Sequence, residues 1–389
     1  MTEGARREYA GELRKRYQGA TRRQKGAILD EYCRVTGHHR KAAIRCLRQA
    51  APAGGRRAGR PRRYGPELVA PLERLWELSG RLSGKLLAAA LPALLTAVER
   101  HGSLALPPEH RVALLGASPA TLDRLLRRPR QQRGRQPRRL RPATGLKVQV
   151  PIRTWGEWHQ PVPGALQADL VLHCGEQTGG FFLATLLAVD VATGWTELEP
   201  VFGLNYHRVR AAVHFTRQRL PFRLRHWHTD NGGEFLNHIL IPWCQRHGIT
   251  YSRGRPYRKN DQAYAEQRNW QVVRRIVGYD RFASRAAHGA LHQVYAPLRH
   301  MLNFFRPTRK LVSKVREGSK VIKRYDRAQT PYQRLLAHGT LTPAARTALA
   351  RQFDTLDPVA LATDLERALT RLWSLRDARR PTPLTAALR

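Results

Sequence analysis

Three carboxylates in the second half of the chain stand where an acid often has a chemical task. Asp169 lies in the middle of an apolar run, Leu166 to Val171, where burying an unpaired charge is costly. Asp230 follows a short predicted strand, Phe222 to His228, and precedes the turn-forming sequence Asn231-Gly232-Gly233. Glu266 comes after a gap of 35 residues, in a segment with helical periodicity. Each acid therefore belongs to a different predicted element.

Three carboxylates are enough to hold the metal ions that catalyse phosphodiester cleavage and transfer. That reaction develops negative charge on the attacking and leaving oxygens, and two Mg²⁺ ions about 3.5–4 Å apart can stabilise both ends of the displacement. Mg²⁺ is usually held by a few carboxylates and keeps water and substrate oxygens around it. Three acids suffice if one bridges the two ions, and Asp169, in a central strand, is the natural bridge.

Each acid also has a simpler interpretation. Asp169 can be a buried, hydrogen-bonded residue, Asp230 a turn former, and Glu266 a solvated helix acid. Asp190 and Glu234 are the nearest rivals for a place in the site. Asp190 is better interpreted as the end of a hairpin, and Glu234 as an acid that favours a helix N-terminus.

The surrounding pattern predicts the elements that hold these acids. We predict strands at 165–173, 181–190, 195–202, 222–228 and 249–252, and helices at 205–219, 234–247 and 261–277. Three successive strands followed by alternating helices and strands favour a mixed sheet covered by helices. We therefore expect an α/β core at residues 147–298.

Charge points to the partner. The 389 residues include 69 Lys plus Arg against 29 Asp plus Glu, a formal net charge of +40. Such an excess excludes an average metabolic enzyme and favours a polyanion as partner. No run of 18 apolar residues and no GxxxxGK[ST] motif is present, so we expect neither membrane binding nor a nucleotide cofactor. Four scattered cysteines indicate free thiols in a reducing compartment.

The N-terminal 49 residues predict a helix-turn-helix DNA-binding module, with a plain helical hairpin as the alternative. Thr21 to Gln24 forms a capping-box pattern, and Gly37 interrupts the helices. The module's expected DNA contacts are Arg40, Lys41 and Arg45. Residues 50–64 form a basic Gly/Pro/Arg linker whose Arg60, Arg62 and Arg63 either enter a minor groove or belong to a solvated tether.

Further DNA-binding segments are predicted downstream. Residues 65–128 predict a second helix-turn-helix module, whose second helix begins at Ser118-Pro119 and presents Thr121 and Arg124. Residues 129–146 form an arginine-rich arm expected to contact phosphates. Its candidate contacts are Arg130, Arg133, Arg135, Arg138 and Arg139. A basic loop before Glu266 and the helix itself add Arg255, Arg258, Lys259 and Arg268. Residues 299–389 are basic and helical.

These motifs resemble a known family. Asp169, the sequence Thr229-Asp230-Asn231-Gly232, and Glu266 after 35 residues resemble the D, D-35-E signature of the retroviral-integrase superfamily. The helix-turn-helix pattern narrows the resemblance to bacterial insertion-sequence DDE transposases. Asn260-Asp261-Gln262 and the residues after Glu266 are also similar to that group. The resemblance covers about residues 160–280 and implies a ribonuclease H-like fold.

The resemblance also implies an activity. Asp169, Asp230 and Glu266 would bind two Mg²⁺ ions, for which Mn²⁺ can substitute, and support DNA cleavage at element ends and transfer of the 3′-OH into target DNA. The implied partners are double-stranded DNA, both terminal inverted repeats and target, and further copies of the chain on that DNA. We expect a cytoplasmic, nucleoid-associated bacterial protein. The order Cys33, His38, His39, Cys46 departs from the family's His-His-Cys-Cys zinc module, so we expect no zinc there.

Two other functions fit the same features. A DNA-binding repressor would keep the fold without activity, although all three acids are intact. A nuclease of the same fold would cut DNA without joining it.

Overall fold

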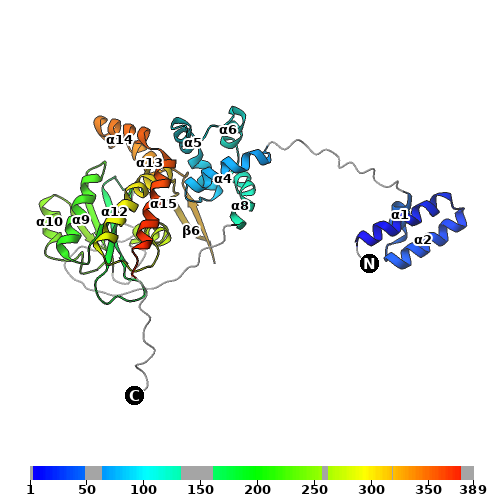
Figure 1. Cartoon of the computed structure of the whole chain (residues 1–389), viewed down its shortest axis with the longest axis horizontal. Coiled ribbons are helices and arrows are strands. Elements are labelled where there is room, and N and C mark those ends of the chain that lie inside the picture. Colours follow the sequence, from blue (N-terminus) through cyan, green and yellow to red (C-terminus); the bar gives the residue numbers. More distant parts are fainter. Residues whose placement is uncertain (1–2, 49–63, 133–160, 256–261, 318, 378–389) are drawn as a thin grey trace, which may run out of the picture. The chain divides into compact units, whose positions relative to one another are not determined.

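The computed structural model describes residues 3–48, 64–132, 161–255, 262–317 and 319–377 (Figure 1). These residues fall into two compact units, within residues 1–63 and 64–389. The predicted linker, apart from Tyr64, and the predicted arm beyond residue 132 lie outside the described residues. No helix in the described part of the chain is long and apolar enough to cross a membrane.

The first unit consists of helices α1 (Glu3–Gly19), α2 (Arg22–Thr36) and α3 (Arg40–Arg48). The backbone N–H of Thr21 donates to Oε1 of Gln24 at 2.9 Å, which caps the start of α2. Gly37 ends α2 with a φ of 70°, a conformation that glycine adopts without strain. All three helices bury a common apolar core, so the predicted N-terminal helical region is confirmed. That core consists of Ala10, Leu13, Tyr17, Ile28, Leu29, Tyr32, Ala43 and Leu47.

The second unit contains two sheets and many helices. Its first helices are η1 (Pro66–Leu68), α4 (Val69–Leu78), α5 (Gly84–Arg100), α6 (Pro108–Leu115), α7 (Pro119–Leu125) and α8 (Arg127–Gln132). Its larger sheet contains β1 (Ala165–His173), β2 (Leu183–Asp190), β3 (Thr196–Val201), β4 (His226–Thr229) and β5 (Thr250–Arg253). Around it lie α9 (Tyr206–Arg219), α10 (Leu240–Arg246), α11 (Ala263–Arg268), η4 (Asn269–Arg274), α12 (Arg285–His300) and η5 (Met301–Phe305). The chain continues through β6 (Leu311–Glu317), β7 (Lys320–Tyr325), α13 (Pro331–Ala337), α14 (Pro343–Thr355) and α15 (Pro358–Ser374).

The five-stranded sheet has the order β3-β2-β1-β4-β5. Strands β1, β2 and β3 pair antiparallel, whereas β4 and β5 run parallel to β1. This is the topology of a ribonuclease H-like sheet, and the predicted fold class is confirmed. Strand β1 is central and pairs with both β2 and β4.

The two faces of β1 have different neighbours, because successive side chains point to opposite faces. Leu166, Ala168 and Leu170 belong to a core formed with α9 and α10. Val171, on the other face, packs with residues of η4, α12 and α15. Asp169 shares this second face, so it lies on the side of the sheet that α11 and η4 cover.

Residues 65–128, predicted as a second helix-turn-helix module, form part of the second compact unit. Ser118 does cap a helix, since its Oγ accepts a hydrogen bond from the Thr121 N–H at 3.2 Å. However, α4 to α7 share one apolar core with Phe304, Phe305 and Leu335. The helical periodicity of residues 65–128 therefore reflects, at least on this face, burial against the C-terminal helices.

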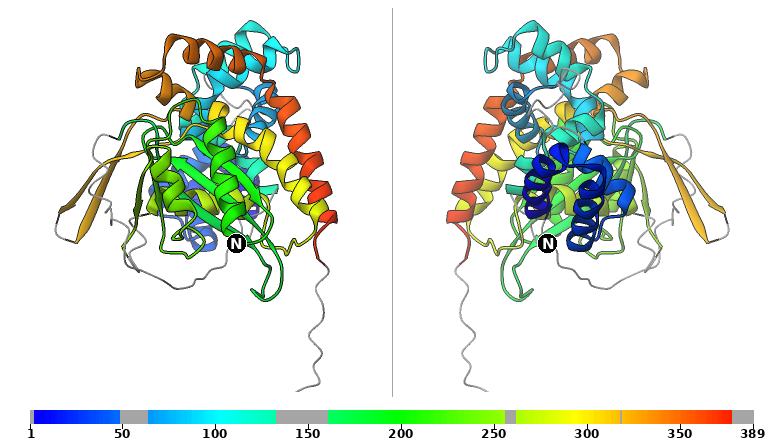
Figure 2. Two further views of the ribbon diagram at one scale, coloured as in Figure 1. Left: turned by 90° about the vertical axis from the view of Figure 1, so that its left-hand side faces the viewer. Right: turned by 90° about the vertical axis from the view of Figure 1, so that its right-hand side faces the viewer.

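The C-terminal region is helical except for one ribbon. Strands β6 and β7 form a separate two-stranded antiparallel sheet in a stretch that we interpreted only as basic. This ribbon stands away from the helices of its unit in both views of Figure 2.

Two predicted helices near the acids differ in detail. The helix predicted at 234–247 is limited to α10, because Oδ1 of Asn237 accepts hydrogen bonds from the N–H groups of Ile239 and Leu240 at 3.0 and 2.9 Å. Such side-chain bonds compete with the helical pattern. The helix predicted at 261–277 changes from α-helical to π-helical at Asn269, and π turns are frequent at functional sites.

Candidate active site

Two of the three acids become neighbours through strand register. Strands β1 and β4 are parallel, and their last pair joins Gln167 to His228. Asp169 in β1 and Asp230, the first residue after β4, each follow this pair by two positions. A side chain at the carboxyl end of a strand next to a central one is well placed for a site in an open sheet. The sheet therefore brings these two carboxylates to the same edge.

The loop that carries Asp230 is held by its own hydrogen bonds. The Gly232 N–H donates to Oδ1 of Asp230 at 3.0 Å. The Asn231 side chain donates to the carbonyl of Gly254 at 3.0 Å and accepts from Arg253 at 2.7 Å. These contacts connect the loop after β4 to the end of β5 and restrict the position of the carboxylate.

The helix that carries Glu266 is attached to β1 on the same side of the sheet as Asp169. Oε1 of Gln167 accepts hydrogen bonds from the N–H groups of Tyr264 and Ala265, at 3.1 and 3.4 Å. Asn269, three residues after Glu266, donates through Nδ2 to Oδ2 of Asp169 at 2.7 Å. Because residues three apart share one face of a helix, Glu266 belongs to the helix face that meets Asp169.

The acids influence one another electrostatically. Burial, followed by the nearby Asp230 carboxylate, raises the pKa of Asp169 to about 7, and Glu266 acts in the same direction. Hydrogen bonds from Asn269 and from the Leu170 backbone oppose this rise. Desolvation by the surrounding protein also raises the pKa of Asp230, against the hydrogen bond from Gly232. The raised pKa values mean that no nearby positive charge fully offsets the burial and mutual repulsion of these carboxylates.

This donor set fits a divalent cation. Carboxylates are the oxygen ligands that Mg²⁺ prefers. The neighbouring carboxylates of Asp230 and Glu266 help to raise the pKa of Asp169, and a bound cation would offset their negative charge. Among the described residues, no three acidic, His or Cys side chains are already close enough to enclose one ion. Asp169, Asp230 and Glu266 are the acids of this region whose carboxylates could contribute to holding such a cation.

The predicted DNA-contacting residues have different positions. Those whose side chains are exposed are Arg40, Lys41, Arg45, Arg124 and Arg255. Those that lie outside the described residues are Arg60, Arg62, Arg63, Arg133, Arg135, Arg138, Arg139, Arg258 and Lys259. On α3, Lys41 and Arg45 lie on the side away from the buried Ala43 and Leu47, whereas Arg40 pairs with Asp30 of α2.

Three of the predicted DNA contacts, Arg268, Thr121 and Arg130, have partners within the protein in this conformation. Arg268 is buried and its guanidinium donates to the carbonyl of Gly194 at 3.4 Å. Thr121 is buried and bonded to Ser118. Arg130 donates to Asp123 at 2.5 Å and lies over the Trp76 ring. Each is occupied by packing because its helix faces a core that the sequence did not show.

The rival acids have other partners. Asp190 is buried at the end of β2, where its carboxylate accepts hydrogen bonds from the Gly164 N–H at 2.8 Å and from the Thr193 N–H and hydroxyl at 2.8 and 2.7 Å. It closes the turn between β2 and β3, so the interpretation as a hairpin end is confirmed. Glu234 lies next to the Asp230 loop, since a Cβ on Gly232 would meet its carboxyl group at 3.0 Å.

Two residues of the site were missed as functional residues. Gln167 precedes Asp169 by two positions, which places it on the same face of a strand. Asn269 follows Glu266 by three positions, which places it on the same face of a helix. Two signals in the sequence could have indicated them. Gln167 is a polar residue in an otherwise apolar strand, and Asn269 is an amide on the same helix as a candidate acid.

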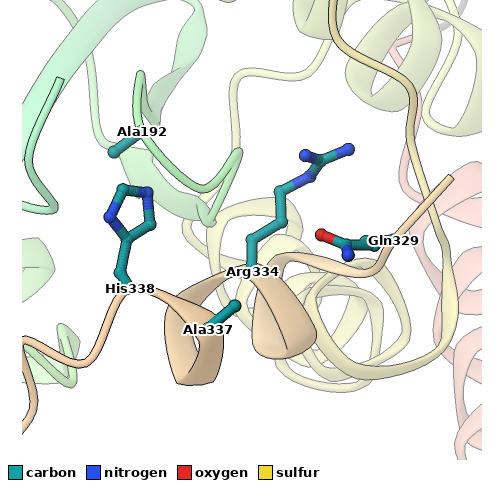
Figure 3. Close-up of a pocket in the computed structure, with 5 residues that line it drawn as sticks. All are labelled: Ala192, Gln329, Arg334, Ala337 and His338. Carbon is teal, nitrogen blue, oxygen red and sulfur yellow. The ribbon is translucent and has the colours of Figure 1, made fainter. Parts of the chain in front are cut away.

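A separate small cleft lies between α13 and the turn after β2. Figure 3 shows its five lining residues, with the His338 ring directed toward Ala192 and the Arg334 side chain extending from α13. They are Ala192, Gln329, Arg334, Ala337 and His338. The cleft encloses about 180 Å³, less than the about 300–1,000 Å³ of a typical small-molecule site.

Comparison with known proteins identifies a domain and a relative that this chain resembles. Residues 159–259 match the model of the integrase core domain. The curated relative, the uncharacterized protein y4rM of Sinorhizobium fredii (strain NBRC 101917 / NGR234), is 43% identical over 322 residues, or 82% of this chain and 91% of y4rM. The chain belongs to the same family as y4rM and contains a segment that matches the integrase core domain. The integrase core domain match supports a polynucleotidyl-transferase-like function in DNA recombination.

Solved structures similar to this integrase-core protein are retroviral. The catalytic core domain of BIV integrase is 21% identical, with a TM-score of 0.28, over 45% of this chain and 95% of that chain. The HTLV-2 integrase catalytic core domain in complex with magnesium (dimeric form) is 15% identical, with a TM-score of 0.30, over 39% of this chain and 93% of that chain.

Proposed function

We propose that this protein is a DNA transposase that cleaves the ends of its element and joins the freed 3′-OH to target DNA. The observation that carries the proposal is the convergence of three acids from separate elements. The register of β1 and β4 brings Asp169 and Asp230 together. The hydrogen bond from Asn269 to Asp169 attaches the Glu266 helix to them.

Both chemical steps are in-line displacements at phosphorus. In cleavage, the oxygen of a water molecule bonds to phosphorus, the bond from phosphorus to the 3′ oxygen breaks, and that oxygen leaves as a 3′-OH. In joining, this 3′-OH attacks a target phosphodiester and the target's own 3′ oxygen leaves. One phosphodiester replaces another, so joining requires no nucleotide cofactor.

The chain's own residues position the acids for these steps. Asp169, Asp230 and Glu266 would hold two Mg²⁺ ions, or Mn²⁺ in their place, which when bound promote attack and stabilise the leaving oxygen. Asn269 orients the Asp169 carboxylate. The Gly232 N–H orients Asp230, and Gln167 fixes the start of the Glu266 helix. Preorganisation of this kind reduces the entropic cost of reaching the reactive geometry.

We further propose that the N-terminal unit recognises element ends through Arg40, Lys41 and Arg45 on α3. These side chains are exposed on one helix, and a helix that follows a short turn can enter a major groove. Recombination joins two ends, so the active form would be a dimer or larger assembly on double-stranded DNA. A cytoplasmic, nucleoid-associated location follows from this substrate.

The proposal is tested with labelled duplexes copied from the DNA that flanks the gene. Wild type and Glu266→Gln are incubated with them in Mg²⁺ or Mn²⁺, and the products are separated on a denaturing gel. We expect nicks at one fixed end position and longer joined products with wild type only. Binding without cutting by both proteins would instead indicate a repressor, and cutting without joining would indicate a nuclease.

A further inference from the structure

The β6–β7 ribbon exposes apolar side chains that no other described element covers. Val312, Val315, Val321 and Tyr325 are 69%, 51%, 43% and 44% exposed. A two-stranded sheet is only marginally stable by itself. The exposed apolar groups lie on both faces of the ribbon, since Val315 pairs with Ile322 and Val321 with Arg316, and exposed apolar groups often mark an interaction surface. The ribbon therefore has the character of a surface that binds a partner.

The charge of the ribbon selects the kind of partner. Residues 311–325 contain five Lys or Arg against one Glu. The side chains of Arg316, Lys323 and Arg324 are exposed. A second copy of the ribbon would bring like charges together, whereas a polyanion would neutralise them. Charge complementarity thus favours a nucleic acid over self-association.

The root of the ribbon is fixed to the body of its unit. The backbone N–H of Lys310 donates to Oδ1 of Asp326 at 2.6 Å, and the Lys310 ammonium donates to the carbonyls of Val191 and Ala192. Arg334 of α13 pairs with Asp326 and donates to the Thr308 carbonyl at 2.8 Å. The strands project from a defined point, the turn between β2 and β3.

That point adjoins the helix of the candidate active site. The Lys310 ammonium lies 5.8 Å from the centre of the Tyr264 ring, and Tyr264 precedes Glu266 by two residues in α11. Arg268, at the end of α11, donates to Gly194 in the same turn between β2 and β3. DNA held at the three acids would leave the site beside the root of the ribbon.

The dimensions also match a duplex. Strands of this length extend about 20 Å at about 3.3 Å per residue. The major groove of B-DNA, about 12 Å wide, admits a two-stranded ribbon. Lys323 and Arg324 are successive residues of β7 and therefore point to opposite faces of the ribbon, so they would reach phosphates on both walls of the groove.

We propose that the β6–β7 ribbon binds the duplex DNA flanking the reacting phosphodiester, with Lys323 and Arg324 contacting phosphates. The inference rests on the proposed function, because it takes DNA to be bound at the three acids. The ribbon would be a further DNA-binding surface. It lies beyond the integrase-core match, which ends at residue 259, and it is separate from the three acids.

The test measures binding of a fluorescent duplex to the full chain over a range of salt concentrations. All proteins carry Glu266→Gln so that the DNA remains uncut. The ribbon variant Lys323→Gln/Arg324→Gln is compared with Arg351→Gln/Arg371→Gln, which removes the same charge from exposed positions on α14 and α15. We expect the ribbon variant to reduce the slope of log affinity against log salt by about 2, since each lost phosphate contact removes about one unit. The control should keep the slope of the parent.

Equal slopes for the two variants would overturn the proposal. So would a ribbon variant that binds DNA normally but loses self-association in sedimentation, because the partner would then be a second copy. Failure of the proposed function gives a different result. In that case protein with intact Glu266 would neither cut nor join, while the salt slope would still depend on the ribbon.

Discussion

The Asp169 carboxylate combines burial, two neighbouring acids and one amide donor in a single residue. Its pKa is raised to about 7, so in metal-free protein it is largely protonated below neutral pH. A divalent cation and a proton compete for this group. Activity that requires the carboxylate should fall as the pH decreases through this region.

Asn269→Leu tests the amide donor. The hydrogen bond from Asn269 lowers the pKa of Asp169, so its removal should raise that pKa further. We expect the acidic limb of the pH–rate profile to move to higher pH, with about 10–100-fold lower activity at pH 7, as is typical when a residue that orients a metal ligand is lost. Asn269→Asp would add a fourth acid and should lose activity without restoring the profile. A profile unchanged in Asn269→Leu would contradict the positioning role.

Asp169→Asn tests the electrostatic cost of the site. A carboxyl group whose pKa is higher in the folded than in the unfolded protein stabilises the fold when protonated, and this contribution is lost as the pH rises from about 4 to about 7. At pH 8 without metal, Asp169→Asn should therefore raise Tm by about 2–4 °C, the shift that about 1 kcal/mol produces in a domain of this size. Thermal unfolding at pH 8 and pH 4 measures it. If Asp169→Asn had a lower Tm than wild type at pH 8, the ionised Asp169 carboxylate would stabilise the fold, and this account would be contradicted.

At the scale of elements, the loop after β4 determines where Asp230 points. A Cβ on Gly232 would lie 3.1 Å from Oδ1 of Asp230, whereas a Cβ on Gly233 meets nothing within 4 Å. Gly232→Ala should displace the carboxylate by a few tenths of an ångström and lower the cleavage rate about tenfold, because small misplacements in a catalytic site are costly. Gly233→Ala is the matched control and should react like wild type. Equal rates for the two variants would show that the loop adjusts freely.

The elements differed in how far the sequence predicted them. The five strands and α9 were predictable because apolar runs and turn residues mark them locally. The restriction of the helix predicted at 234–247 to α10 was not, since it depends on the Asn237 side chain bonding to its own backbone. The positions of Asp169, Asp230 and Glu266 on separate elements were predicted. Their attachment through Gln167 and Asn269 depends on strand register and helix docking, which no local pattern gives.

At the scale of the whole molecule, the catalytic fold depends on both of its flanks. The core that includes Leu87 and Leu94 of α5 also includes Phe304 and Phe305 of η5. Ala368 and Leu372 of α15 pack with residues of α12. Separate modules were predicted because helical periodicity shows which face of a helix is buried but not which partner covers it.

This dependence predicts how fragments behave. Residues 64–377 should unfold in one cooperative transition, whereas a fragment of residues 161–300 should aggregate, because it exposes the apolar surfaces that η5 and α15 cover. Thermal unfolding and binding of a hydrophobic dye compare the two. A soluble 161–300 fragment with cooperative unfolding would contradict the shared core.

The most direct test of the central claim is joining from a substrate that already carries a free 3′-OH at the element end. Wild type, Glu266→Gln and Glu234→Gln are compared in Mg²⁺, with longer labelled strands as the readout. The account predicts joined products with wild type and Glu234→Gln, and a loss of at least about 10²–10³-fold with Glu266→Gln. Joining by Glu266→Gln at the wild-type rate, or loss confined to Glu234→Gln, would show that Asp169, Asp230 and Glu266 are not the catalytic set.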